Sequence, residues 1–172
     1  MCIRDRHCIF LNAKNVTKTG LDLTNLQFIS EEKDSSLRKG KLDRNDIIVT
    51  TRGTVGNFAY YSTLVPYEHI RINSGMVILR NTSSQIDTRL LYRLMKLGYF
   101  KHEISKHAYG SAQPQLSVKI IESLKIPFYN DENKKRINSM LDKFEALGAA
   151  SDEKLDATKK ALISLNLAVL GE

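Results

Sequence analysis

The chain has 172 residues, of which 42% are hydrophobic, enough for one packed domain with an appendage and too many for a wholly disordered protein. No stretch approaches the roughly 18 consecutive apolar residues of a membrane-spanning helix, and the N-terminus lacks the apolar core of a signal peptide. The two cysteines, Cys2 and Cys8, form no disulfide framework or metal-binding pattern, so we expect a cytoplasmic protein with reduced thiols.

The net charge of +7 is concentrated in the middle of the chain. Residues 51–130 contain ten Lys and Arg against four Asp and Glu, whereas residues 131–172 contain seven against eight. A basic surface attracts polyanions because neutralisation of phosphates releases bound counterions. This surplus favours a nucleic-acid partner for the middle of the chain, with an incidental basic surface as the alternative.

The first 130 residues predict a mixed α and β domain because short β-branched runs alternate with turn residues. Strands are expected over residues 46–51, 58–61, 75–80 and 124–126. A helix is expected after Asp87, a good capping residue, because the leucines that follow share one face with a methionine. A second helical stretch is expected over residues 99–107, followed by a polar loop at 109–115.

The composition changes after residue 130. Residues 131–170 contain no proline and are rich in helix-forming residues, and alternating steps of four and three mark a heptad-like apolar seam. The hydrophobic positions of this seam are Ile137, Leu141, Phe144, Leu155, Leu162, Leu165 and Val169. The seam is interrupted at residues 148–151, so the pattern predicts either one long helix or a kinked helix pair. An apolar stripe of this length needs a partner surface.

Motifs for catalysis or cofactor binding are missing from the sequence. There is no phosphate-binding loop and no dinucleotide fingerprint, and the turn at residues 52–56 is not followed by a helix whose N-terminus would hold a phosphate. His102 and His107 are five residues apart, one too many for the paired histidines of a zinc hydrolase. We therefore expect no catalytic residue, no metal site and no cofactor.

Three segments occur in an order that carries a family resemblance. The first is a strand opened by Asp46 and closed by Arg52-Gly53-Thr54-Val55-Gly56. The second is the loop Gly110-Ser111-Ala112-Gln113-Pro114-Gln115-Leu116-Ser117, and the third is Ile126-Pro127 before the helical tail. In this order and spacing, residues 9–170 resemble a target recognition domain and spacer helix of type I restriction–modification specificity subunits.

The resemblance implies an α+β fold. A mixed-sheet DNA target recognition domain, residues 1–130, would precede a helical spacer, dimerisation and methyltransferase-docking segment, residues 131–172. It also implies sequence-specific recognition of double-stranded DNA that directs the methyltransferase and restriction subunits. Those partner chains would carry out methylation and cleavage, so this chain is not expected to be an enzyme.

Members of the family carry two recognition domains. The single domain here therefore indicates a half-subunit or an N-terminally truncated fragment, whose partner would be a second copy or a second specificity half. The alternative to a DNA role is a helix-tailed interaction scaffold whose basic surface is incidental.

The candidate DNA contacts lie in three polar segments. Arg52 can reach a guanine edge or a phosphate, and the amides of Gln113 and Gln115 can pair with adenine. The complete set is Lys14, Asn15, Lys18, Arg52, Thr54, Asn57, Ser111, Gln113 and Gln115. For each position, ordinary turn hydrogen bonding, loop packing or solvation is the alternative.

Overall fold

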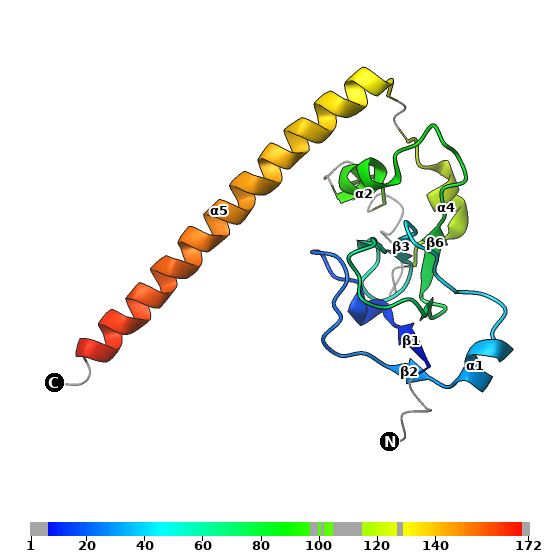
Figure 1. Ribbon diagram of the computed structural model, residues 1–172, viewed down its shortest axis with the longest axis horizontal. Helices are drawn as coiled ribbons and strands as arrows, with labels where there is room; N and C mark the ends of the chain where they lie inside the picture. The colour runs from blue at the N-terminus through cyan, green and yellow to red at the C-terminus, as the bar shows by residue number, and fades with distance from the viewer. Residues whose placement is uncertain (1–6, 97–99, 101, 105–114, 127–128, 170–172) are drawn as a thin grey trace. The chain divides into compact units, whose positions relative to one another are not determined.

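The computed structural model describes residues 7–96, 100, 102–104, 115–126 and 129–169, and within the last segment no side chain of residue 152 or of residues 155–169 (Figure 1). The chain divides into two compact units, residues 1–127 and 128–172. The change in composition along the sequence predicts this boundary at residue 130.

One sheet of the first unit contains a parallel pair of strands. Its strands, in spatial order, are β2 (Phe28–Ile29), β1 (Cys8–Leu11) and β5 (Ile70–Ile72). Strand β1 runs antiparallel to β2 and parallel to β5. Residues 40–42 run along the free side of β5, because Ile72 N donates to Gly40 O at 2.8 Å and Leu42 N to Ile70 O at 2.9 Å.

The other sheet is antiparallel throughout. Its strands, in spatial order, are β4 (Phe58–Tyr60), β3 (Ile47–Thr50) and β6 (Met76–Leu79). Ile48 of β3 is paired with Ala59 on one side and Ile78 on the other. Strand β3 is therefore the central strand and lies beside β6 (Figure 1).

Strand β3 separates two hydrophobic cores. Ile48 belongs to the core that also contains Leu11 of β1 and Ile70 of β5. Ile47 and Val49 point the other way, into a core shared with helix α2 (Thr88–Lys96). All four residues of β3 are buried because the strand is covered on both faces, which explains its continuous β-branched sequence.

The short helices of the first unit are capped at their N-termini by polar side chains. Ser30 caps α1 (Glu31–Ser36) and Ser117 caps α4 (Val118–Ser123). The Asp87 carboxylate accepts a hydrogen bond from Leu90 N at 3.0 Å at the start of α2. The capping role expected for Asp87 is confirmed.

The strands expected at 46–51, 58–61 and 75–80 are present with slightly shorter bounds. The strand expected at 124–126 is wrong, because Leu124 ends helix α4 and residues 124–126 pair with no strand. The expected helix at 99–107 lies mostly outside the described residues. Strands β2 and β5 and helix α1 carry no clear periodic signal, because each is only two to six residues long.

The second unit contains one uninterrupted helix, α5 (Asp131–Val169). Asn130 begins it, since its side chain accepts from Asn133 N at 2.8 Å. The helix continues through residues 148–151, so the kinked pair is wrong and the single long helix is confirmed. A Cβ added at Gly148 would meet nothing within 4 Å. At about 1.5 Å per residue, its 39 residues span roughly 58 Å. None of the helices in the described part of the chain is long and apolar enough to cross a membrane.

Candidate nucleic-acid interface

The turn after β3 is built by two glycines and one threonine. Gly53 and Gly56 have φ values of +73° and +80°, a region that side chains with a Cβ rarely adopt. The Thr50 hydroxyl lies inside the turn, where it donates to Thr54 O and accepts from Asn57 N at 3.0 Å. The spacing of Arg52-Gly53-Thr54-Val55-Gly56 therefore specifies a rigid turn that leaves Arg52 exposed.

The loop after β1 is held by Asn12 and Asn15. The Asn12 side chain accepts from Lys14 N at 2.9 Å, and that of Asn15 accepts from Asn12 N at 3.1 Å. The Asn15 amide also donates to the carbonyls of Asp22 and Asn25, and only 4% of the residue is exposed. Asn15 therefore supports the loop from within, and we do not retain it as a DNA contact. Lys14 is exposed.

The loop and the turn lie side by side although they are about 41 residues apart in sequence. The Asn57 amide donates to Val16 O at 3.0 Å, and the Thr54 hydroxyl donates to Ala13 O at 3.3 Å. Both side chains were expected to reach DNA phosphates. In the structure they join the turn to the loop, and Asn57 is half-buried in doing so.

Two further segments, at Gly75 and at Leu116, are hydrogen-bonded to the backbone of the turn. The amides of Thr51 and Arg52 both donate to Gly75 O, at 2.8 and 3.2 Å, and Leu116 N donates to Thr51 O at 3.0 Å. The exposed Gln115 therefore lies next in sequence to a residue bound to the turn. Ser111 and Gln113 lie outside the described residues.

A lysine that the sequence analysis missed adjoins this region. Lys96, at the end of α2, donates to Thr19 O at 3.3 Å, and its ammonium lies 5.6 Å from the centre of the Tyr92 ring. Lys18, immediately before Thr19, is exposed. Helical periodicity marks only the buried face of α2, so no sequence signal connects Lys96 with a turn about 77 residues earlier.

The exposed cations around these segments form what we call the turn edge. Its members are Lys14, Lys18, Arg52 and Lys96. Thr54 and Gln115 are exposed polar residues of the same edge. Such an arrangement suits a polyanion, because long basic side chains project from a backbone that is already ordered.

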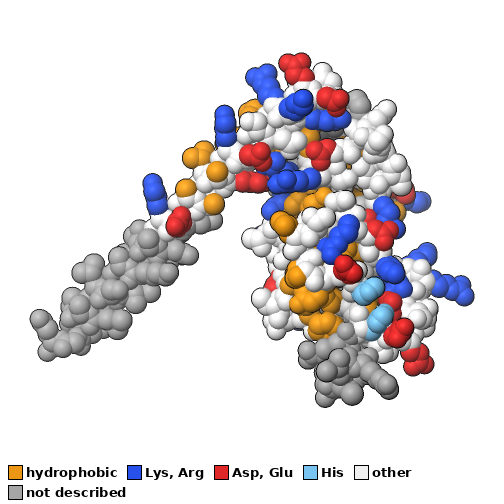
Figure 2. All heavy atoms as spheres, viewed as in Figure 1, with side chains coloured by type: hydrophobic (Ala, Val, Ile, Leu, Met, Phe, Trp, Pro, Cys, Tyr) orange, Lys and Arg blue, Asp and Glu red, His pale blue; other side chains and the backbone are white. Residues whose placement is uncertain are grey.

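The charge surplus of residues 51–130 is only partly available at the surface. Arg71 is 7% exposed and forms an ion pair with Asp34, and Arg93 is 6% exposed. Arg80 forms ion pairs with Asp43 at 2.7 Å and with buried Asp46 at 2.8 Å. The count of charges along the sequence therefore overstates the basic surface, and Figure 2 shows basic and acidic side chains intermixed on the viewed face.

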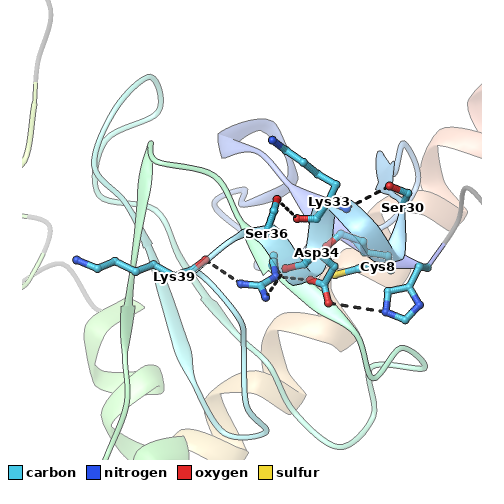
Figure 3. A network of polar contacts seen from close by, with 9 residues as sticks. Cys8, Ser30, Lys33, Asp34, Ser36 and Lys39 are labelled. Carbon is cyan, nitrogen blue, oxygen red and sulfur yellow. Dashed lines mark hydrogen bonds and ion pairs between the residues drawn. The ribbon is translucent and has the colours of Figure 1, made fainter.

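The Asp34 network joins helix α1 to strands β1 and β5 through Asp34, Cys8 and Arg71 (Figure 3). The hydrogen bond from Arg71 holds the pKa of Asp34 below its ordinary value of 3.8. Arg71 also donates to the carbonyls of Asp34 and Lys39, each at 2.9 Å. Burial, assisted by the Asp34 charge, raises the pKa of the Cys8 thiol to about 11. In the described residues, no group of three or more His, Cys, Asp or Glu is placed to hold a metal ion.

Comparison with known proteins identifies the family. The family model for the type I restriction modification DNA specificity domain matches residues 12–158. No curated relative matches the chain.

Two solved structures share the fold. A chain from a study of complex assembly and conformational transition of the type I restriction–modification system has a TM-score of 0.69 at 13% identity, over 89% of this chain and 40% of that chain. The HsdS subunit from Thermoanaerobacter tengcongensis has a TM-score of 0.62 at 15% identity, over 85% of this chain and 37% of that subunit. This chain therefore spans about two fifths of the length of these structural relatives. Because the family model covers most of its residues, the chain belongs to the type I restriction modification DNA specificity domain family.

Proposed function

We propose that the first unit recognises double-stranded DNA in a sequence-specific manner through the turn edge, as the DNA-reading part of a type I restriction–modification complex. One observation carries the proposal. Segments at residues 12–18, 51–57 and 115–116, far apart in sequence, are joined by backbone and side-chain hydrogen bonds into one surface with exposed cations. Membership of the DNA specificity domain family indicates that the partner of these cations is DNA.

The exposed residues of the turn edge divide into two roles. Lys14, Lys18 and Lys96 are point charges on ordered loops and suit phosphates, which position a protein on DNA without reading its sequence. Arg52 has a planar guanidinium that fits a guanine edge, and the Gln115 amide can pair with adenine. Gln113 and Ser111, in the same polar loop as Gln115, remain predicted DNA contacts.

Helix α5 would serve as the spacer and docking segment. It would pair with a second copy of this chain or with a second specificity half, and would bind the methyltransferase subunit, which the restriction subunit joins. Methylation and cleavage would then be carried out by those partners, in the cytoplasm, and this chain would contribute recognition alone. Its exposed hydrophobic residues, including Phe144 at 66% exposure, support a partner for the helix.

Selection from a randomised DNA duplex pool tests the recognition function. The full chain, together with a cognate methyltransferase subunit, should enrich duplexes that share a short motif. Arg52→Ala and Gln115→Ala should change the enriched bases, because base contacts specify and phosphate contacts only position. Lys125→Gln is the control, since Lys125 is exposed beside helix α4 at the opposite end of β6, and it should enrich the wild-type motif. Retention of no duplex at low salt would favour the interaction scaffold instead.

A further inference from the structure

A second basic segment, which we call the strap, lies along the outer side of β5. It comprises residues 38–41, Arg38-Lys39-Gly40-Lys41, and its three cationic side chains are exposed. Ile72 N donates to Gly40 O at 2.8 Å, and residues 41 and 71 form an isolated antiparallel bridge. The strap is therefore an added edge segment of the sheet and not a free loop.

Gly40 and Arg71 fix the strap in place. Gly40 has a φ of +89°, and a Cβ there would lie 2.8 Å from Ile72 O, so only glycine permits this close approach. Arg71 donates to the Lys39 carbonyl at 2.9 Å, and Figure 3 shows the Lys39 side chain pointing away from the network. The cations thus project from a backbone whose order is already established.

The topology places the start of the strap near the ends of strands β1 and β5, on the same side of the sheet as the loop after β1. Strands β1 and β5 are parallel, so Leu11 and Ile72 both end there, and Asn73 N donates to Leu11 O at 3.0 Å. Gly40 pairs with Ile72. Neighbouring strands are about 4.8 Å apart, and β5 lies between Gly40 and Leu11. The two residues are therefore separated by two such spacings, or roughly 10 Å. Arg38 and Lys39 come just before Gly40, and Lys14 follows Leu11. The cations of the strap and those of the loop after β1 therefore both lie near the C-terminal ends of strands β1 and β5.

The short turn at residues 73–75 lies between the strap and the turn edge. Arg38 and Lys39 line an open hollow of about 840 Å³ together with Asn73 and Ser74. The Asn73 side chain accepts from Gly75 N at 3.0 Å, and the Gly75 carbonyl accepts from Arg52 N. The strap and Arg52 are therefore separated by a single short turn, residues 73–75.

We propose that Arg38 and Lys39 bind DNA phosphates as a second row of contacts, beside the turn edge. The inference rests on the proposed DNA function. The backbone positions from which the two rows extend, Gly40 and Leu11, lie roughly 10 Å apart. This spacing is comparable to the width of about 12 Å of the major groove, so the two rows can reach phosphates on either side of it. Glu31 and Glu32 do not oppose this, because they follow Ile29, which pairs with Cys8 at the other end of β1.

Salt dependence of binding tests the strap. Affinity of the full chain for a labelled DNA duplex of arbitrary sequence is measured from about 50 to 200 mM salt. The double variant Arg38→Gln/Lys39→Gln should lower the slope of log affinity against log salt by about 1.8, because each lost phosphate contact removes about 0.9. The loss should be equal on different duplex sequences, since phosphates carry no sequence information.

A matched control removes two positive charges elsewhere. Lys33→Gln/Lys125→Gln changes exposed lysines on α1 and beside α4 and should keep the wild-type slope. If the strap variant also keeps the wild-type slope, the strap does not touch DNA while the turn edge still does. If the strap variant binds DNA normally but no longer binds the methyltransferase subunit, the strap serves an acidic protein surface and the inference is overturned. Wild-type chain that binds no duplex at any salt overturns the inference and the proposed function together.

Discussion

Arg80 binds both carboxylate oxygens of Asp46, with Nε 3.0 Å from Oδ1 and Nη2 2.8 Å from Oδ2. Asp46 also accepts from Asp43 N at 2.7 Å and is 1% exposed. The aspartate that opens the strand of the family motif is therefore a buried structural residue. It fixes the start of β3, whose far end carries the Arg52 turn.

Asp46→Ala should lower the free energy of unfolding by about 3 kcal/mol, because it leaves the Asp43 amide and part of the Arg80 guanidinium without their acceptor. Urea denaturation checks this value. Arg80→Ala should cost a similar amount, because it leaves the Asp46 carboxylate, which is 1% exposed, without its cation. A cost of Asp46→Ala below about 1 kcal/mol would contradict the structural role assigned to the carboxylate.

The glycines of the turn give a second prediction. Gly56→Ala should destabilise the protein by about 1–2 kcal/mol, because alanine is strained at positive φ, and its Cβ would lie 3.3 Å from Ile104 Cγ2. Gly53→Ala carries the same strain, but its Cβ would meet only Ala13 at an ordinary 3.8 Å. Urea denaturation should rank Gly56→Ala as the less stable variant. Gly148→Ala, in open space on α5, is the control and should cause no loss.

The Arg52–Gly56 turn also shows how much the sequence could predict. Its strand, its turn and the absence of a following helix were predictable, because a β-branched run and two glycines act over a few residues. The hydrogen bonds from Thr54 and Asn57 to the loop at 13–16 were not, since nothing local encodes a partner some 41 residues away. The burial of Asn15 could not be predicted for the same reason, because the local sequence around an asparagine is alike in an exposed turn and in a buried, hydrogen-bonded position.

The strap illustrates a different limit. The sequence Arg38-Lys39-Gly40-Lys41 is typical of a solvated polar loop, and nothing in the sequence distinguishes Arg71 from an exposed charged residue. Only the pairing with β5 and the Asp34–Arg71 network give the segment a fixed position. Charge counted along the chain could therefore suggest a polyanion partner but could not say which cations are free to meet it.

The Asp34–Arg71 pair predicts a pH dependence of stability. The pKa of Asp34 is lowered in the folded protein, so the folded state binds the proton less tightly than the unfolded state. Its stabilising contribution is complete above the ordinary carboxyl pKa of 3.8 and is lost as the pH falls through the lower folded value. The difference in unfolding free energy between wild type and Asp34→Asn should be about 2 kcal/mol near neutral pH and should shrink in acid.

Urea denaturation at a series of pH values measures this difference. Glu31→Gln, which changes an exposed carboxylate on the same helix, should stay within about 0.5 kcal/mol of wild type at neutral pH. A difference between wild type and Asp34→Asn that grows as the pH falls would show that the sign of the pKa shift is wrong.

Helix α5 gives the last prediction. Met140, Phe144 and Leu147 are 51%, 66% and 67% exposed, and their spacing of four and three residues places them on one face. Complete burial of one such side chain is worth about 1.5–3 kcal/mol, so three of them offset part of the cost of association. We expect the full chain to form a dimer in solution or to bind a methyltransferase subunit through this face.

Phe144→Glu should therefore reduce the mass in solution, measured by light scattering, or abolish capture of the methyltransferase subunit. Ala146→Glu introduces the same charge about 200° around the helix from Phe144, at 100° per residue, and should retain both properties. Leu162→Glu extends the test to the distal part of the apolar seam. If the wild type is a monomer that binds no methyltransferase subunit, the helix has no such partner. If Phe144→Glu and Ala146→Glu behave alike, the partner uses another face, because an added charge disrupts association only where it enters the buried contact.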